Sequence, residues 1–101
     1  MKKEYDMDLY VIRRRSNWAD ASELETTAAK STAEGEKMSD EVRWIRSYVV
    51  EEDDGRLGTV CIYEGVSPEA ISRHAENTGM SADEITRVAD TVIVREDPVA
   101  V

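Results

Sequence analysis

Residues 42–65 read VRWIRSYVVEEDDGRLGTVCIYEG, and the architecture of the whole chain can be worked out from them. Two runs rich in β-branched and aromatic residues, Glu41–Glu51 and Leu57–Gly65, are typical of strands. Asp54-Gly55 lies between the runs, and an Asp-Gly pair in that position is a strong signal for a tight hairpin turn. The sequence therefore predicts two antiparallel strands joined by a short turn.

A helix is predicted directly after this hairpin. Ser67 can cap its first turn, Pro68 fits the first helical position, and Glu69 complements the positive end of the helix dipole. The helix should run to about Thr78 and stop at Gly79, because glycine readily adopts the left-handed conformation that ends many helices.

A second helix is predicted upstream of the hairpin, from about Ala21 to Glu34. Asp20 and Glu23 have the spacing of a capping box in its wider sense, and Gly35 is expected to end the helix. The inner stripe of this helix consists mostly of small side chains: Leu24, Ala28, Ser31 or Thr32, and Gly35. Such a stripe buries little apolar area, so the helix should lie close to whatever it covers.

Two further strands complete the pattern. The first is predicted at about Met7–Arg14 and the last at about Ile85–Arg95, while Ser81–Glu84 matches a capping box and predicts one short helical turn. The order strand, helix, strand, strand, helix, strand predicts one α+β domain of ferredoxin-like type over residues 1–101. In that fold a four-stranded antiparallel sheet carries both helices on one face.

The alternation of side chains along the two central strands predicts which of them face the helices. The aliphatic side chains Val60 and Ile62, with Glu64, are assigned to the helix-covered face. The opposite face then collects five residues with aromatic bodies or polar tips: Trp44, Arg46, Tyr48, Cys61 and Tyr63. Because this surface is too apolar to face water, we predict a homodimer with sheet packed on sheet and a ligand pocket at that interface.

The composition limits the classes of partner. The chain has 101 residues with 22 acidic and 13 basic side chains, a formal net charge of −9. Such a field repels nucleic acids and anionic membranes, and it resembles the surface of proteins adapted to high salt. Cys61 is the only cysteine, which excludes an internal disulfide, and without an apolar leader or membrane span the expected location is the cytoplasm.

Three segments of the chain resemble a known family. They are VRWIRSYV at residues 42–49, CIYE at 61–64 and SPEAISRHA at 67–75, followed by Gly79 and Ile85, and they cover roughly half of the chain. The family consists of small bacterial and archaeal proteins, a domain of unknown function to which nickel binding is often ascribed. The resemblance implies a ferredoxin-like fold that pairs into a dimeric α+β barrel, and binding of a divalent metal, nickel in particular, in at least some members.

The only histidine, His74, is a candidate metal ligand together with Glu64. Both are predicted to face the space between sheet and helix, so we expect contact, as a ligand pair or as a general base oriented by its carboxylate. The alternative is a structural histidine hydrogen-bonded to Glu64 or to the backbone. One histidine and one glutamate cannot complete an octahedral nickel shell, so a second subunit, further carboxylates or water would have to contribute.

The other chemically interesting residues have simpler interpretations. Cys61 is expected to be a packed thiol rather than a soft ligand or nucleophile, and Glu51–Asp54 a solvated hairpin tip rather than a loose calcium site. Arg13–Arg15 either contact an anion or balance nearby acids, and the second interpretation is preferred. No phosphate loop, zincin motif, nucleophile elbow or catalytic triad occurs. Three functions therefore stay open: metal binding, binding or cofactor-free turnover of a small molecule, and a structural dimer module.

Overall fold

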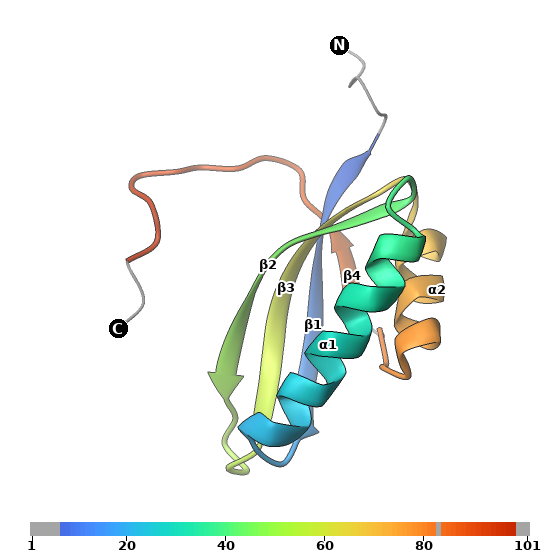
Figure 1. Ribbon diagram of the computed structural model, residues 1–101. Coiled ribbons are helices and arrows are strands. Elements are labelled where there is room, and N and C mark those ends of the chain that lie inside the picture. Colours follow the sequence, from blue (N-terminus) through green and yellow to red (C-terminus); the bar gives the residue numbers. More distant parts are fainter. Residues whose placement is uncertain (1–6, 83, 99–101) are drawn as a thin grey trace.

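The computed structural model describes residues 7–82 and 84–98 (Figure 1). In chain order the elements are β1 (Asp8–Trp18), α1 (Ala21–Lys37), β2 (Val42–Glu51), β3 (Leu57–Gly65), α2 (Pro68–Thr78) and β4 (Glu84–Arg87). The predicted order of strands and helices is therefore confirmed.

The four strands form one antiparallel sheet in the order β2-β3-β1-β4. Both helices cover the same face of this sheet, and the opposite face carries no helix among the described residues (Figure 1). This is the ferredoxin-like arrangement that the sequence predicts.

The helix ends follow the capping signals with one exception. Asp20 accepts a hydrogen bond from the Glu23 amide at 3.0 Å, and Ser67 accepts one from the Ala70 amide at 3.1 Å. Gly79 ends α2 in the left-handed conformation, with φ of 81°. The prediction that Gly35 ends α1 is wrong, because the helix continues through this residue to Lys37.

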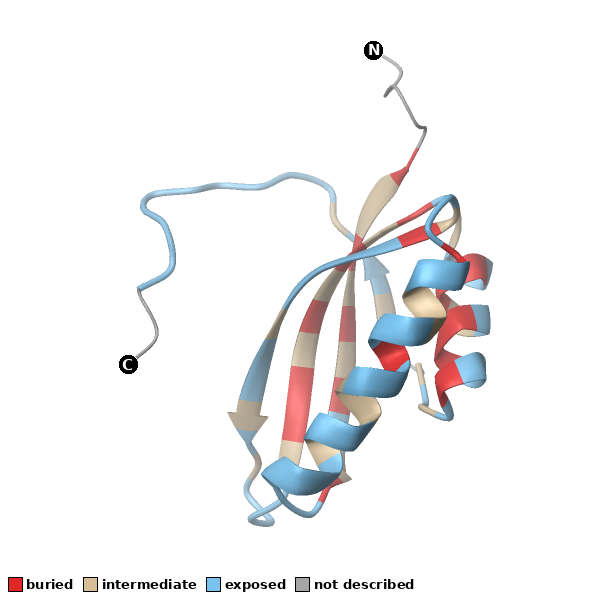
Figure 2. Ribbon diagram, in the orientation of Figure 1, coloured by how far each residue is buried: buried red, intermediate tan, exposed pale blue. Residues whose placement is uncertain are grey.

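The hydrophobic core lies between α2 and the middle strands. It includes Tyr10 and Ile12 of β1, Val42 of β2, Tyr63 of β3 and Ile71 of α2. Figure 2 shows buried residues concentrated along α2, β1 and β3, whereas most of α1 is exposed. The core therefore occupies one half of the space beneath the helices.

The last strand is shorter than predicted, since β4 ends at Arg87 rather than Arg95. Among the described residues it pairs with Tyr10–Arg13 of β1, and the Val88 amide donates the next hydrogen bond to the Leu9 carbonyl at 2.9 Å. The described residues beyond Val88 form no strand. The apolar run Val92–Val94 is consequently exposed, by 72% to 86%.

Two smaller predictions about local structure also differ. No helical turn forms at residues 81–82, and Glu84 already belongs to β4; Asp83 lies outside the described residues. The first strand extends beyond Arg14 to Trp18. The pairing is irregular there, because the four residue steps from Arg14 to Trp18 in β1 are matched by only two steps along β3. Ser16 lies in this stretch with φ of 54°. Trp18 follows this stretch on the helix-covered side of the sheet, where it is buried and contacts Thr27 of α1.

No helix within residues 7–82 and 84–98 combines the length and the apolar character that crossing a bilayer requires.

Candidate functional site

The structure reverses the predicted faces of β3. Tyr63 and Cys61 are buried beneath the helices, with 2% and 5% exposure, while Val60, Ile62 and Glu64 lie on the open face and are partly buried. The prediction assumed that aliphatic side chains fill the core. Instead the Tyr63 ring fills it, and its hydroxyl finds a polar partner in Ser31 Oγ of α1 at 3.3 Å.

A bulge in β2 explains why the five predicted pocket residues do not share one face. The pairing of β2 with β3 shifts between Trp44 and Arg46, so Ile45 is an extra residue and the alternation changes there. Trp44 therefore lies on the helix-covered face, where its ring stacks on Tyr63 with centroids 6.1 Å apart. Arg46 and Tyr48 point to the open face and contact Asp97, at 3.2 Å and 2.6 Å respectively.

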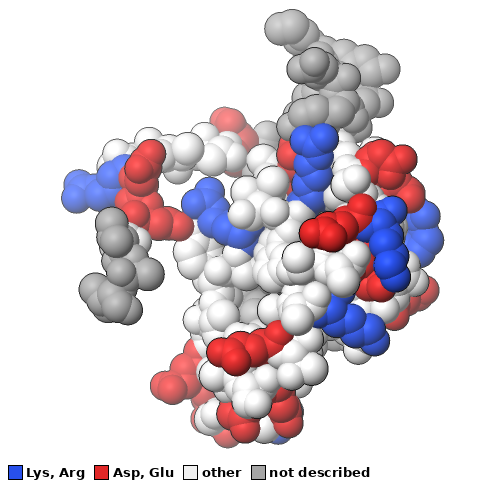
Figure 3. Space-filling view, in the orientation of Figure 1, with Lys and Arg blue, Asp and Glu red and all other residues white. Residues whose placement is uncertain are grey.

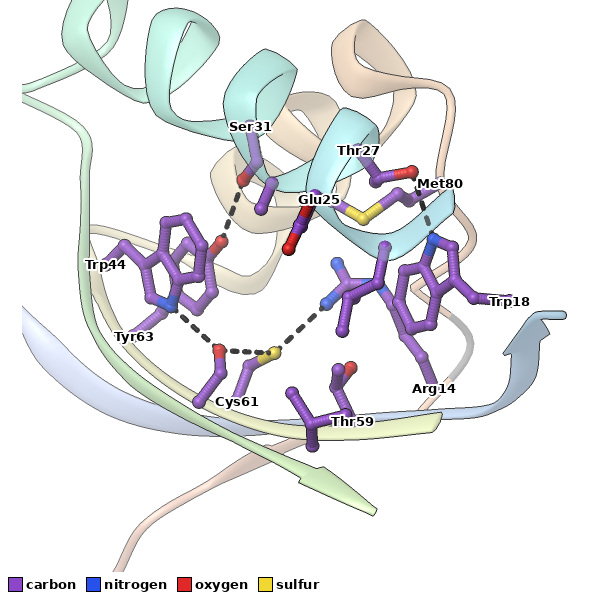
Figure 4. A pocket seen from close by; sticks show the side chains of 14 residues that line it. Arg14, Trp18, Glu25, Thr27, Ser31, Trp44, Thr59, Cys61, Tyr63 and Met80 are labelled. Carbon is purple, nitrogen blue, oxygen red and sulfur yellow. Dashed lines mark hydrogen bonds between the residues drawn. The ribbon is translucent and has the colours of Figure 1, made fainter. Parts of the chain in front are cut away.

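A cavity of about 190 Å³ lies between α1 and the sheet. Its apolar walls are formed by Trp18, Leu24, Ala28, Trp44, Tyr63 and Met80 (Figure 4). Three of the five residues predicted for a pocket, Trp44, Cys61 and Tyr63, line it, although on the face opposite to the predicted one. Both tryptophans of the chain line the same cavity.

Hydrogen bonds fix the polar atoms of the two indoles. Trp18 Nε1 donates to Thr27 Oγ1 at 2.9 Å, and Trp44 Nε1 donates to Ser47 Oγ at 2.8 Å. The Ser47 hydroxyl in turn donates to Cys61 Sγ at 3.0 Å. The cavity is therefore bounded by aromatic rings whose orientations are held by protein contacts.

The arginine run is divided between two roles. Arg13 pairs with Glu52 at 2.8 Å and Arg15 with Glu84 at 2.9 Å, in agreement with the prediction that these residues balance acids. Arg14 is different, because its side chain enters the cavity and the residue is only 2% exposed. Sequence reasoning did not single out Arg14 from its two neighbours, although it has the same strand parity as the buried Tyr10 and Ile12.

The described polar contacts of the Arg14 side chain are a backbone carbonyl and a sulfur atom. Its Nε donates to the Ser81 carbonyl at 2.7 Å, and one terminal nitrogen lies 3.6 Å from Cys61 Sγ. Within residues 7–82 and 84–98, no carboxylate lies within ion-pair distance of Arg14. Thr59 is paired directly opposite Arg14 in the sheet, and its buried Oγ1 has no hydrogen-bond partner in that part of the chain.

His74 has the structural role that was left open as an alternative. It is 1% exposed, its Nε2 lies 3.1 Å from the Ser31 carbonyl oxygen, and its ring is tilted against Tyr63 with centroids 5.6 Å apart. Because a carbonyl oxygen only accepts, Nε2 carries the hydrogen and donates it. Burial lowers the pKa of His74 below its ordinary value of 6.5.

The predicted contact between His74 and Glu64 is wrong. Glu64 pairs with Leu9 and Arg43 on the open face of the sheet, one residue after the inward-facing Tyr63. The sheet itself therefore separates the carboxylate from the imidazole, since consecutive strand residues point to opposite faces.

A nickel ion does not fit the donors of one chain. No group of three or more histidine, cysteine or acidic side chains able to hold a metal occurs in the described ranges 7–82 and 84–98. The Nε2 of His74 is occupied by the Ser31 carbonyl, and the Cys61 thiol lies beside the cationic Arg14, which would repel a metal ion. Any nickel site therefore needs donors beyond residues 7–82 and 84–98 of one chain.

Comparisons with known proteins agree with the fold. A family model described as "Nickel responsive protein SCO4226-like" matches residues 10–88. The crystal structure of SCO4226 from Streptomyces coelicolor A3(2) is similar to this chain, with a TM-score of 0.65 and 22% sequence identity. The similarity covers 83% of this chain and 99% of that one. No curated protein sequence matches the chain significantly.

Proposed function

Because the chain belongs to the SCO4226-like family of nickel-responsive proteins, we propose that it serves such a response by binding a small organic molecule in the cavity beneath α1. The single observation that carries this proposal is the cavity itself. Its walls are almost wholly apolar and include two indoles and a phenol ring, the side chains that most often line ligand sites. The cavity can accept a ligand because the small side chains of α1 leave it unfilled.

The size of the cavity limits the ligand. Its volume of about 190 Å³ lies below the usual range for drug-sized ligands, roughly 300 to 1,000 Å³. An engineered apolar cavity of about 150 Å³ binds benzene. We therefore expect a compact molecule with a single ring or a short aliphatic body.

Intrinsic fluorescence tests this proposal, because both tryptophans line the cavity. Titration with toluene should change the emission in a saturable manner. The control is Ala28→Leu, which adds side-chain volume at a partly buried position on the cavity wall. This variant should lose the response while keeping its stability, and an undiminished response in it would contradict binding at this cavity.

Nickel binding is a second candidate, favoured by the description of the family. Since the described residues of one chain lack a suitable donor set, we propose that two copies would share the site across the open faces of their sheets. Glu64 supplies a carboxylate on this face. Calorimetric nickel titration should give weaker binding for Glu64→Gln than for the wild type, and equal heats for the two proteins would contradict this candidate.

The proposed homodimer rests on the character of the open sheet face. Val11, Val60 and Ile62 are partly buried there, and Tyr48 is 42% exposed beside them. Burial of this face against a second copy would remove apolar area from water. Sedimentation in molar salt should give the mass of a dimer for the wild type and a smaller mass for Ile62→Asp. A monomeric wild type would contradict the proposal.

A further inference from the structure

We propose that the ligand of the cavity beneath α1 is a small organic monocarboxylate, held at its charged end by Arg14 and Thr59. This inference rests on the proposed small-molecule binding and names the chemical class of the ligand. Its evidence is a buried cation without an ion-pair partner and a buried hydroxyl without a hydrogen-bond partner among the described residues, both lining one cavity.

The guanidinium of Arg14 requires a counter-charge. Removing a cation from water costs several kcal/mol unless an anion and well-placed hydrogen bonds compensate. The Ser81 carbonyl and the Cys61 sulfur satisfy part of its hydrogen-bonding capacity, but neither is a carboxylate. Throughout residues 7–82 and 84–98, no acidic side chain forms an ion pair with it. The planar fork of a guanidinium suits a carboxylate, which can accept two parallel hydrogen bonds.

Thr59 provides the second, independent observation. Its Oγ1 is buried, with the residue 3% exposed, and it has no hydrogen-bond partner within the described chain. Such an atom is rare in native structures and calls for an explanation. Thr59 pairs directly with Arg14 across β1 and β3, so both side chains leave the sheet on the same face a few ångströms apart. One carboxylate can therefore accept hydrogen bonds from both residues.

The remainder of the cavity defines the body of the ligand. Figure 4 shows Arg14 and Thr59 between Trp18 at one end and the stacked Trp44 and Tyr63 at the other. Flat aromatic walls favour a planar ring, and the volume of about 190 Å³ limits that ring to a single one with short substituents. An aromatic or short branched monocarboxylate meets both requirements.

The surrounding charge favours a single negative charge on the ligand. Glu25 is an exposed residue of α1 that lines the cavity, so its carboxylate opposes an entering anion. Acidic side chains also gather at the lower end of the molecule, over the β2–β3 hairpin and the start of α1 (Figure 3). With a net charge of −9, the protein repels dianions more strongly than monoanions.

Isothermal titration calorimetry with benzoate and benzamide tests the inference, since the two probes share shape and differ in charge. The wild type should bind benzoate at least about tenfold more tightly than benzamide, the ratio expected of a hydrogen-bonded charge. Arg14→Met should abolish this preference. Glu25→Gln should bind benzoate more tightly, because it removes a like charge from the cavity.

Thr59→Val keeps the test valid if Arg14→Met fails to fold. Valine has nearly the same shape as threonine and removes a hydroxyl that has no partner, so folding stability should be kept or raised. Benzoate affinity should fall by about tenfold and benzamide affinity should change less.

Equal affinity of the wild type for benzoate and benzamide would overturn the inference, as would unchanged benzoate binding in Thr59→Val. If toluene binds and benzoate does not, the carboxylate is excluded while small-molecule binding stands. If none of the three probes binds, the proposed function fails with it.

Discussion

The two helices cover the same face of the sheet but differ greatly in how many of their residues are buried. In α2, with 11 residues, five are buried, whereas in α1, with 17 residues, only Ser31 is buried. The half of the interior beneath α2 is a close-packed core, and the half beneath α1 contains the cavity. We infer that stability and ligand binding are assigned to different helices of one small fold.

The side chains themselves account for this difference. The inward residues of α2 include Ile71 and His74, which fill space and reach the sheet and α1. The inward residues of α1 are short, so at Thr27 and Ala28 the helix leaves a gap above the strands. Ser31 is the exception, because its hydroxyl and carbonyl contact Tyr63 and His74.

The largest expected contrast is in stability. Ile71→Ala removes a side chain that is 1% exposed and should lower the free energy of unfolding by about 2–5 kcal/mol. Leu24→Ala, in the partly buried stripe of α1, should cost about 1 kcal/mol or less because it enlarges a cavity that is already open. Urea denaturation measures both values. Similar losses would mean that α1 contributes to the core as much as α2.

Stability should also depend on pH through His74. Burial lowers the pKa of the folded imidazole below 6.5, so the unfolded chain binds the proton more readily. The stabilising contribution is present above the ordinary value and is lost as the pH falls from there through the lowered pKa of the folded state. His74→Gln removes this titration, so its unfolding free energy should fall less steeply than that of the wild type as the pH is lowered. Parallel pH profiles for the two proteins would contradict the assignment.

Capping signals made much of the architecture predictable from sequence. Asp20, Ser67 and Gly79 act locally, through backbone groups within a few residues, and each has the predicted role. The hairpin turn at Asp54-Gly55 is equally local, and Gly55 has φ of 82°. These features depend on neighbours in sequence, which a single sequence displays.

The faces of the sheet could not be predicted because they depend on register. The bulge at Ile45 separates Trp44 from Arg46, and no residue type in that stretch requires a bulge. The faces of β3 were reversed for a different reason, since the prediction placed its aliphatic residues in the core, where Cys61 and Tyr63 lie instead. That reversal puts Glu64 on the face opposite His74.

Arg14 illustrates a further limit of sequence reasoning. Three consecutive arginines look equivalent, yet alternation buries the middle one and exposes the others to acids. The parity of the strand would have identified it, had Tyr10 and Ile12 been taken as the reference for the inward face. An arginine at an inward strand position is therefore a buried cation whose partners need to be identified.

A matched pair of glycines gives a smaller contrast between the helices. Gly35 lies within α1, and a Cβ there would meet His74 Nε2 at 3.6 Å, an ordinary contact, so Gly35→Ala should stabilise by about 0.5–1 kcal/mol. Gly79 ends α2 with φ of 81°, where alanine is strained, so Gly79→Ala should destabilise by about 1–2 kcal/mol. Thermal melts show whether each substitution raises or lowers the melting temperature. Shifts in the same direction for the two variants would contradict the backbone argument.

The smallest expected effect comes from salt, which acts on the surface of both halves. The net charge of −9 is screened over about 3 Å at 1 M salt and about 30 Å at 0.01 M. Exposed ion pairs such as Arg73 with Glu41 contribute only about 0–1 kcal/mol each. The main effect of high salt should therefore be to screen the repulsion among the acidic side chains. The melting temperature should therefore be lower in dilute buffer. A midpoint that stays level or rises there would contradict this expectation.

The most direct test of ligand binding beneath α1 is a nuclear magnetic resonance titration with benzoate that follows the two indole N–H signals. Trp18 and Trp44 are the only tryptophans in the chain and both line the cavity. Both signals should shift together and saturate, while the amide of Ala75 in the packed α2 should move little. If neither indole signal moves with millimolar benzoate or with toluene, or if Ala75 moves as much as they do, the proposed division between the two helices is wrong.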